Sequence, residues 1–115
     1  MPDISPVFDE LRALMLTAAP GATATLDGPG HIDLKGPATD PKTGEPAWFG
    51  MVKIGARAVS YHLPPLYHRP SLADGLSPAL KKRQQGKTCF NFTKVDPVLF
   101  DELSALTRRC AKEAI

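Results

Sequence analysis

Proline is the residue that most restricts what this chain can fold into. The 115-residue chain contains twelve prolines, about twice the average frequency, and proline interrupts the interior of helices and of central strands. Three of them follow a residue that can cap a helix and precede an apolar run, in the pairs Ser5-Pro6, Ser77-Pro78 and Asp96-Pro97. The cap oxygen accepts a free backbone N–H, and proline at the first helical position has no N–H to lose. The prolines therefore predict short elements and three helix starts.

The ends of these three helices follow from breakers and from the apolar pattern. The first helix stops at Pro20-Gly21. The middle one runs from Pro78 to about Gln85, with Gly86 as the residue that follows its C-terminus. The last carries apolar residues at helical spacing from Leu99 to Cys110. Two amphipathic helices of this kind need a common apolar surface to cover.

Five segments between the helices alternate apolar and polar residues with a period of two, as strands do. They are residues 22–26, 31–34, 48–54, 57–63 and 87–93. A loop at residues 37–46, with a tight reversal at residues 40–44, separates the second from the third. The order α-β-β-β-β-α-β-α predicts a single α+β domain over residues 1–115, with a mostly antiparallel sheet of about five strands and helices packed on one face.

The third and fourth segments form the clearest predicted hairpin. Gly55-Ala56 suits a two-residue type II′ turn, because glycine supplies the positive φ at the first central position. This turn would place Ile54 opposite Arg57 and sort the side chains onto two faces. The predicted core face holds Trp48, Gly50, Val52, Ile54, Arg57, Val59, Tyr61 and Leu63. The predicted second face holds Phe49, Met51, Lys53, Ser60 and His62, joined by Cys89 and Asn91 if Phe90 and Phe92 enter the core.

Charge and cysteine content narrow the classes of partner. The net charge is +2, which is too mild to indicate a nucleic-acid partner. The longest uncharged apolar stretch, residues 13–26, is broken by Pro20-Gly21 and too short to cross a membrane. Cys89 and Cys110 form no CxxC motif and are expected to be reduced thiols. These features predict a cytoplasmic protein without a membrane partner.

His62 and Cys89 are the two residues whose chemistry stands out. If they share the second face, they could act as a general base and a nucleophile, or contribute to a metal site with a third ligand. However, Cys89 lies within a strand and no helix N-terminus follows it to activate the thiol. His68 follows Pro64-Pro65, which predicts extended backbone, so the two histidines share no helix face. We therefore predict no metal site and no cofactor. His62 and Cys89 stay among the predicted ligand- or partner-binding residues of the second face, with Phe49, Met51, Lys53, Ser60 and Asn91, and the sequence leaves open whether their role is functional or structural.

The segment KKRQQGK is the densest positive cluster. Its charged members are Lys81, Lys82, Arg83 and Lys87. These residues could hold a phosphate or an acidic partner. They also suit the solvated end of a helix, where cations interact with the last carbonyls, and this is the favoured interpretation.

Several motifs together resemble one known family. The segments AAPGATATL, FGMVKIGARAVSYHLPPLY, KKRQQGKTCFNF and FDELSAL follow one another as in the YdhG-like family of bacterial domains of unknown function. The resemblance covers about residues 11–106 and implies the same α+β fold. One branch of that family is described as a frataxin-like iron chaperone that binds iron through surface carboxylates. Here such a surface would come from Asp3, Asp9 and Glu10, and the chain is basic overall, so we do not transfer the iron role.

The leading functional hypothesis is a non-enzymatic binding module. Phe49 and Met51 on the second face would expose an apolar patch unless a ligand, another protein or a second copy of the chain covers it. The alternative is a metal (iron) carrier or a small enzyme that uses His62 and Cys89.

Overall fold

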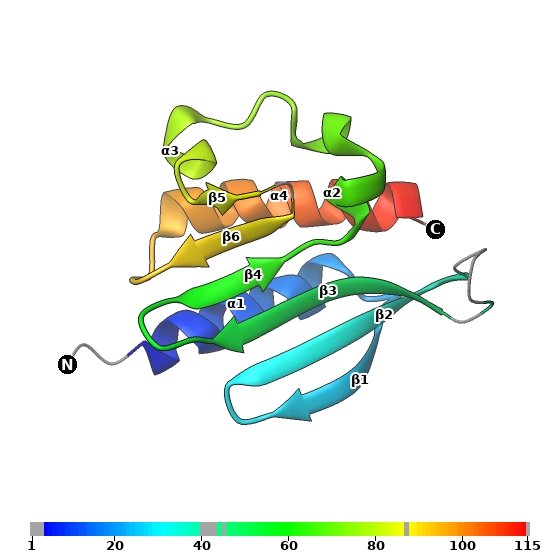
Figure 1. Ribbon diagram of the computed structural model, residues 1–115, viewed down its shortest axis with the longest axis horizontal. Coiled ribbons are helices and arrows are strands. Elements are labelled where there is room, and N and C mark those ends of the chain that lie inside the picture. The colour runs from blue at the N-terminus through cyan, green and yellow to red at the C-terminus, as the bar shows by residue number, and fades with distance from the viewer. Residues whose placement is uncertain (1–3, 40–43, 45, 87, 115) are drawn as a thin grey trace.

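A computed structural model describes residues 4–39, 44, 46–86 and 88–114. It confirms the α+β class: the described residues form an antiparallel sheet of six strands in the order β1-β2-β3-β4-β6-β5, together with helices (Figure 1). In chain order the elements are α1 (Ser5–Ala18), β1 (Thr23–Gly28), β2 (His31–Thr39), β3 (Pro46–Ile54), β4 (Val59–His62), α2 (Pro65–His68), the 3-10 helix η1 (Pro70–Ala73), α3 (Pro78–Lys81), β5 (Gln84–Gln85), β6 (Cys89–Phe92) and α4 (Pro97–Ala114).

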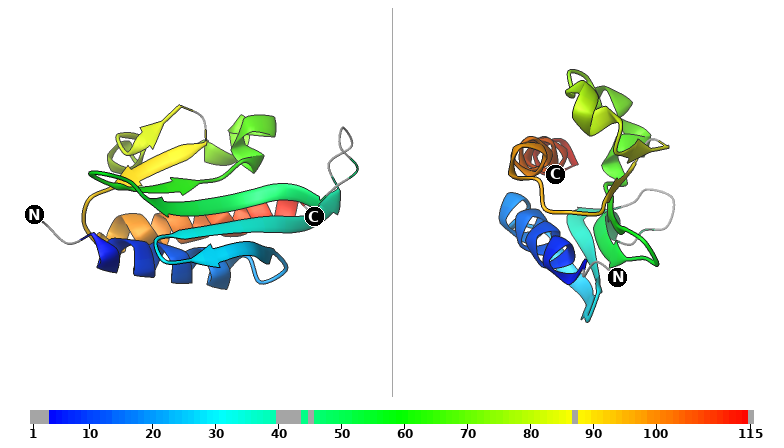
Figure 2. Two further views of the ribbon diagram at one scale, coloured as in Figure 1. Left: turned by 60° about the horizontal axis from the view of Figure 1, so that its bottom comes forward. Right: turned by 90° about the vertical axis from the view of Figure 1, so that its left-hand side faces the viewer.

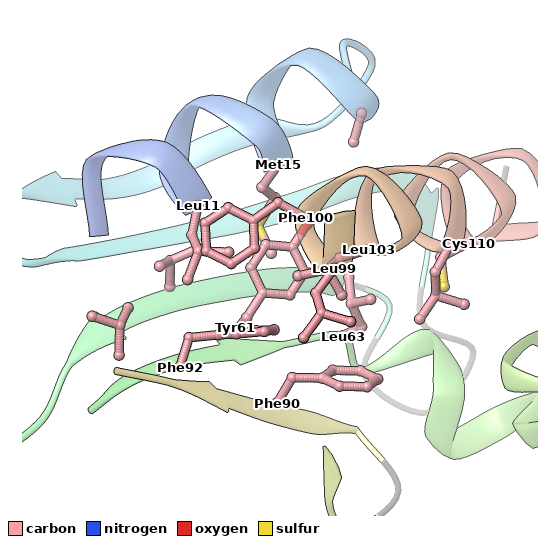
Figure 3. Close-up of a cluster of buried hydrophobic side chains, with 14 of the residues drawn as sticks. Leu11, Met15, Tyr61, Leu63, Phe90, Phe92, Leu99, Phe100, Leu103 and Cys110 are labelled. Carbon is pink, nitrogen blue, oxygen red and sulfur yellow. The ribbon is translucent and has the colours of Figure 1, made fainter. Parts of the chain in front are cut away.

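The core lies between the sheet and the two long helices. Helices α1 and α4 lie side by side against one face of the sheet, as two further views show (Figure 2). Leucines and aromatic rings from both layers interlock there (Figure 3). Helix α1 comes close to β3 at Gly50, where a Cβ atom would lie only 2.7 Å from the Sδ atom of Met15. We call the other face of the sheet, which neither long helix covers, the open face (Figure 1).

Two of the three predicted helix caps are confirmed. The Ser77 hydroxyl accepts a hydrogen bond from the Leu80 N–H at 3.2 Å, and the Asp96 carboxylate accepts one from the Leu99 N–H at 3.2 Å. The Ser5 cap is wrong, because α1 begins at Ser5 itself and Ile4 occupies the capping position. The Ser77 N–H and hydroxyl also donate to the Glu102 carboxylate, at 2.7 and 2.6 Å. This pair of bonds ties the start of α3 to α4.

Three predicted boundaries in the second half of the chain are wrong. The middle helix ends at Lys81 and not near Gln85, because Gln84 and Gln85 pair with β6 as the short strand β5. Gly86 has a φ of 70° and lies in the connection between these two strands instead of after a helix. Pro64-Pro65 does not impose extended backbone but starts helix α2, since proline fits the first helical positions.

The register of the β3–β4 hairpin differs from the predicted one by two residues. Ile54 pairs with Val59 and not with Arg57. The Gly55 N–H donates to the Ala58 carbonyl at 2.8 Å, so residues 55–58 form the loop. Gly55 has no positive φ, which excludes a type II′ turn. A shift of two residues keeps the paired residues 51–54 and 59–62 on their predicted faces, because the period of a strand is two.

A β-bulge in β3 reverses the predicted positions of Trp48 and Phe49. Leu34 lies opposite Gly50, and the next residue of β2, Lys35, lies opposite Trp48. Phe49 is therefore an extra residue, and such a residue breaks the alternation of a strand. Phe49 is 3% exposed in the core, whereas Trp48 is 39% exposed and contacts His62 on the open face. The predictions that Trp48 faces the core and Phe49 the second face are wrong.

The remaining loop prediction concerns residues 37–46. Strand β2 continues to Thr39, which pairs with Pro46, so part of this segment is strand. The predicted reversal at residues 40–44 lies, apart from Gly44, outside the described residues.

Candidate functional site: the open face of the sheet

The open face is organised in rows of side chains that run across the strands. One row follows the pairing from strand to strand through all six strands. Its members are Leu26, Asp33, Met51, His62, Cys89 and Gln85. The structure thus brings Met51, His62 and Cys89 together as direct neighbours.

A parallel row holds the other predicted site residues. His31 pairs with Lys53, Lys53 with Ser60, and Ser60 with Asn91. The Ser60 hydroxyl donates to the Asn91 side-chain carbonyl at 3.0 Å, and the Asn91 amide donates to the Gln85 side-chain carbonyl at 2.7 Å. These bonds link β4, β6 and β5 and hold this part of the face in one arrangement. Every predicted site residue of the second face except Phe49 therefore lies on the open face.

His62 is held firmly between two neighbours. Its Nδ1 atom is hydrogen-bonded to the Thr88 hydroxyl at 3.1 Å, and its ring lies 4.8 Å from the Trp48 ring at an interplanar angle of 44°. Burial lowers the pKa of His62, and the nearby Asp33 charge partly opposes this effect. A lowered pKa favours the neutral imidazole at neutral pH. His62 therefore contributes a neutral, oriented ring to the open face.

Cys89 lies opposite His62 but its thiol is not activated. Burial raises the pKa of Cys89, and a hydrogen bond with Ser60 offsets only part of that effect. The thiolate is the reactive form of cysteine, so a raised pKa reduces reactivity at neutral pH. Burial also raises the pKa of Cys110, to about 12, in the core under α4. The arrangement does not favour Cys89 and His62 as a nucleophile and its base.

One close contact between described residues of the open face could matter for metal binding. His31 Nε2 lies 3.3 Å from the Asp33 carboxylate on the same strand. Among the described residues, however, no group of three or more His, Cys, Asp or Glu side chains is placed to hold a metal ion. The alternative of an iron carrier stays a prediction. Of the three acids that would form its surface, Asp9 and Glu10 are exposed on α1, and Asp3 lies outside the described part of the chain.

The predicted basic cluster lies at the β5 edge of the sheet, beside the end of the row that holds Asn91. Lys81 ends α3, and Lys82 and Arg83 follow in the turn before β5, all three exposed. The Arg83 carbonyl accepts a hydrogen bond from the Asn91 N–H at 2.9 Å, so the backbone here is fixed to β6. Lys87 lies outside the described residues. The exposed side chains suit the solvated helix end that the sequence favours.

Sequence reasoning missed the residue that most changes the character of the open face. Trp48 is the only tryptophan of the chain, and Lys35 places its Nζ atom 6.0 Å from the centre of the Trp48 ring. The adjacent aromatic residues followed by glycine, WFG, were the available signal, because glycine in a strand often accompanies a bulge. The pattern alone does not say which of two neighbouring aromatic rings enters the core.

Comparisons with known proteins add no relative. No protein-family model, curated protein or solved structure matches the chain. The resemblance to the YdhG-like family therefore stays a prediction from the quoted motifs. Within the described residues, no helix is long and apolar enough to cross a membrane.

Proposed function

We propose that the chain is a non-enzymatic binding module whose open face holds a ligand or a protein partner. The exposure of Trp48 on a face that neither long helix covers is the observation that carries this proposal. A large aromatic ring left 39% exposed loses the free energy that burial would provide, and such residues are enriched in binding surfaces. The half-buried Met51 and His62 adjoin it in the same region.

The location and the family belong to the same proposal. Cys89 and Cys110 are free cysteines, which is usual in a reducing compartment, and we place the module in the cytoplasm on that ground. The quoted motifs are the support for a YdhG-like domain. The alternative of a metal carrier or an enzyme using His62 and Cys89 gains no support from the raised Cys89 pKa.

The proposal is tested by a substitution that places a negative charge on the open face. We expect Met51→Glu to keep the fold, because Met51 is only partly buried, and to abolish any ligand binding or self-association of the wild type. The measurements are a thermal-shift screen with small metabolites and sedimentation velocity up to high protein concentration.

A matched control separates the open face from a general effect of charge. Val98 on α4 is 77% exposed, so Val98→Glu adds the same group away from the sheet and is expected to behave as wild type. The proposal fails if no compound shifts the melting temperature and the wild type stays monomeric at every concentration. It also fails if Val98→Glu removes the binding and Met51→Glu does not.

A further inference from the structure

Trp48 offers an exposed and fixed aromatic ring on which a planar ligand could stack. It is the only aromatic residue among the described residues of the sheet that is exposed, since Phe49, Tyr61, Phe90 and Phe92 are all buried. The His62 ring packs against the indole, with 4.8 Å between the ring centres and an angle of 44° between the ring planes. The hydrogen bond between His62 and Thr88 limits the movement of the imidazole. A ring fixed in this way loses little conformational entropy when a planar ligand stacks on it.

The positive charge of Lys35 lies over this ring. Lys35 lies opposite Trp48 in the β2–β3 pairing, and its Nζ atom is 6.0 Å from the ring centre, at the outer limit of a cation–π contact. Lys35 forms no ion pair with a carboxylate of the described residues, and the Asp33 carboxylate on the same strand is already 3.3 Å from His31. The ammonium is thus available to a ligand that carries a negative group.

We propose that Trp48, Lys35 and His62 form a site for a small planar aromatic ligand bearing a carboxylate or a phosphate. The ring of the ligand would stack on the indole, and its anion would pair with Lys35. A single exposed ring among the described residues of the sheet suits one ligand ring, whereas single-stranded nucleic acid is held by successive aromatic residues along a basic groove. This inference rests on the proposed function and adds the chemical class of the ligand.

The single tryptophan makes the site directly observable. In a 15N-labelled sample the indole N–H of Trp48 gives one side-chain peak, which can be followed during titration. The probes are adenosine 5′-monophosphate and naphthalene-2-carboxylate, each compared with its neutral counterpart, adenosine and naphthalene-2-methanol, and with inorganic phosphate and acetate. We expect saturable shifts with the charged aromatic probes, weaker binding of the neutral rings, and no shift with phosphate or acetate. Comparison of the two charged probes distinguishes phosphate from carboxylate ligands.

Two lysine variants test the role of the charge. Lys35→Gln is expected to weaken the binding of the charged probes about two- to fivefold, which is the contribution of an exposed ion pair. The affinity for the neutral probes should stay unchanged. Lys112 is an exposed lysine on α4, on the other side of the sheet, so Lys112→Gln is expected to leave the binding of charged and neutral probes unchanged.

The outcomes separate this inference from the broader proposal. Equal binding of charged and neutral rings, or equal effects of Lys35→Gln and Lys112→Gln on the binding of the charged probes, would overturn the inference. If only neutral compounds or a second copy of the chain perturb the open face, the anionic ligand class is wrong and the binding module stands. If no probe perturbs it, the inference fails, whereas the binding module fails only if the thermal-shift screen and the sedimentation measurements are also negative.

Discussion

Replacing Phe49 by alanine is expected to lower the free energy of unfolding by about 3–5 kcal/mol, the usual cost of removing a buried phenylalanine ring. Phe49 is 3% exposed and belongs to the core cluster under the long helices. Trp48→Ala removes a larger side chain but one that is 39% exposed. Its expected cost is about 1 kcal/mol, mostly from the lost contact with His62. Denaturant unfolding followed by circular dichroism measures both variants without relying on tryptophan fluorescence.

The order of these two costs tests the β-bulge in β3. Without the bulge, regular alternation would place Trp48 in the core and Phe49 on the open face. Trp48→Ala would then be the more destabilising change. That reversed order would contradict the described register between β2 and β3.

Replacing Thr107 by valine is expected to lower the free energy of unfolding by about 1–3 kcal/mol, because a buried hydroxyl loses its partner. The Thr107 hydroxyl donates to the Leu103 carbonyl at 2.8 Å, so its oxygen accepts the 2.6 Å hydrogen bond from the Tyr61 hydroxyl. Tyr61 is fully buried between β4 and α4 (Figure 3), and this burial raises its pKa. In the Thr107→Val variant the buried Tyr61 hydroxyl would have no hydrogen-bond acceptor, so the cost of removing it from water would not be offset.

The double variant provides the control. Tyr61→Phe alone leaves Thr107 bonded to Leu103 and is expected to cost about 0.5–1.5 kcal/mol. Combining Tyr61→Phe with Thr107→Val removes both partners, so the measured loss should be smaller than the sum of the two single losses. Strict additivity would show that the two hydroxyls do not interact in the native protein.

Features that depend on residues close together in the sequence, such as helix caps and strand alternation, were predicted correctly in several places. Ser77 and Asp96 cap helices as expected, since their hydroxyl and carboxylate oxygens reach backbone N–H groups three residues ahead. The alternation in β4 and β6 also placed Tyr61 and Phe90 in the core and His62 and Cys89 on the other face. Such features depend on neighbouring residues in the chain alone.

Features that depend on a partner strand could not be predicted in the same way. Trp48 and Phe49 are both large and aromatic, so the apolar pattern is equally satisfied with either ring in the core. The pairing of Lys35 with Trp48 decides between them, and no residue of β3 alone reports it. Gln84 and Gln85 have little intrinsic preference for strand and become β5 because β6 offers them a free edge. The sequence therefore predicted the polar residues of the open face, but it did not predict that Trp48 lies there.

The central claim is that Trp48 lies on an uncovered face of the sheet, and the intrinsic fluorescence of this single tryptophan tests it most directly. The native protein should be measured at low micromolar concentration, where a weak dimer would dissociate, with acrylamide as the quencher. We expect emission typical of a partly hydrated indole and ready quenching of the folded protein. Blue-shifted emission that acrylamide quenches only after the protein is unfolded would place Trp48 in the core and contradict the claim.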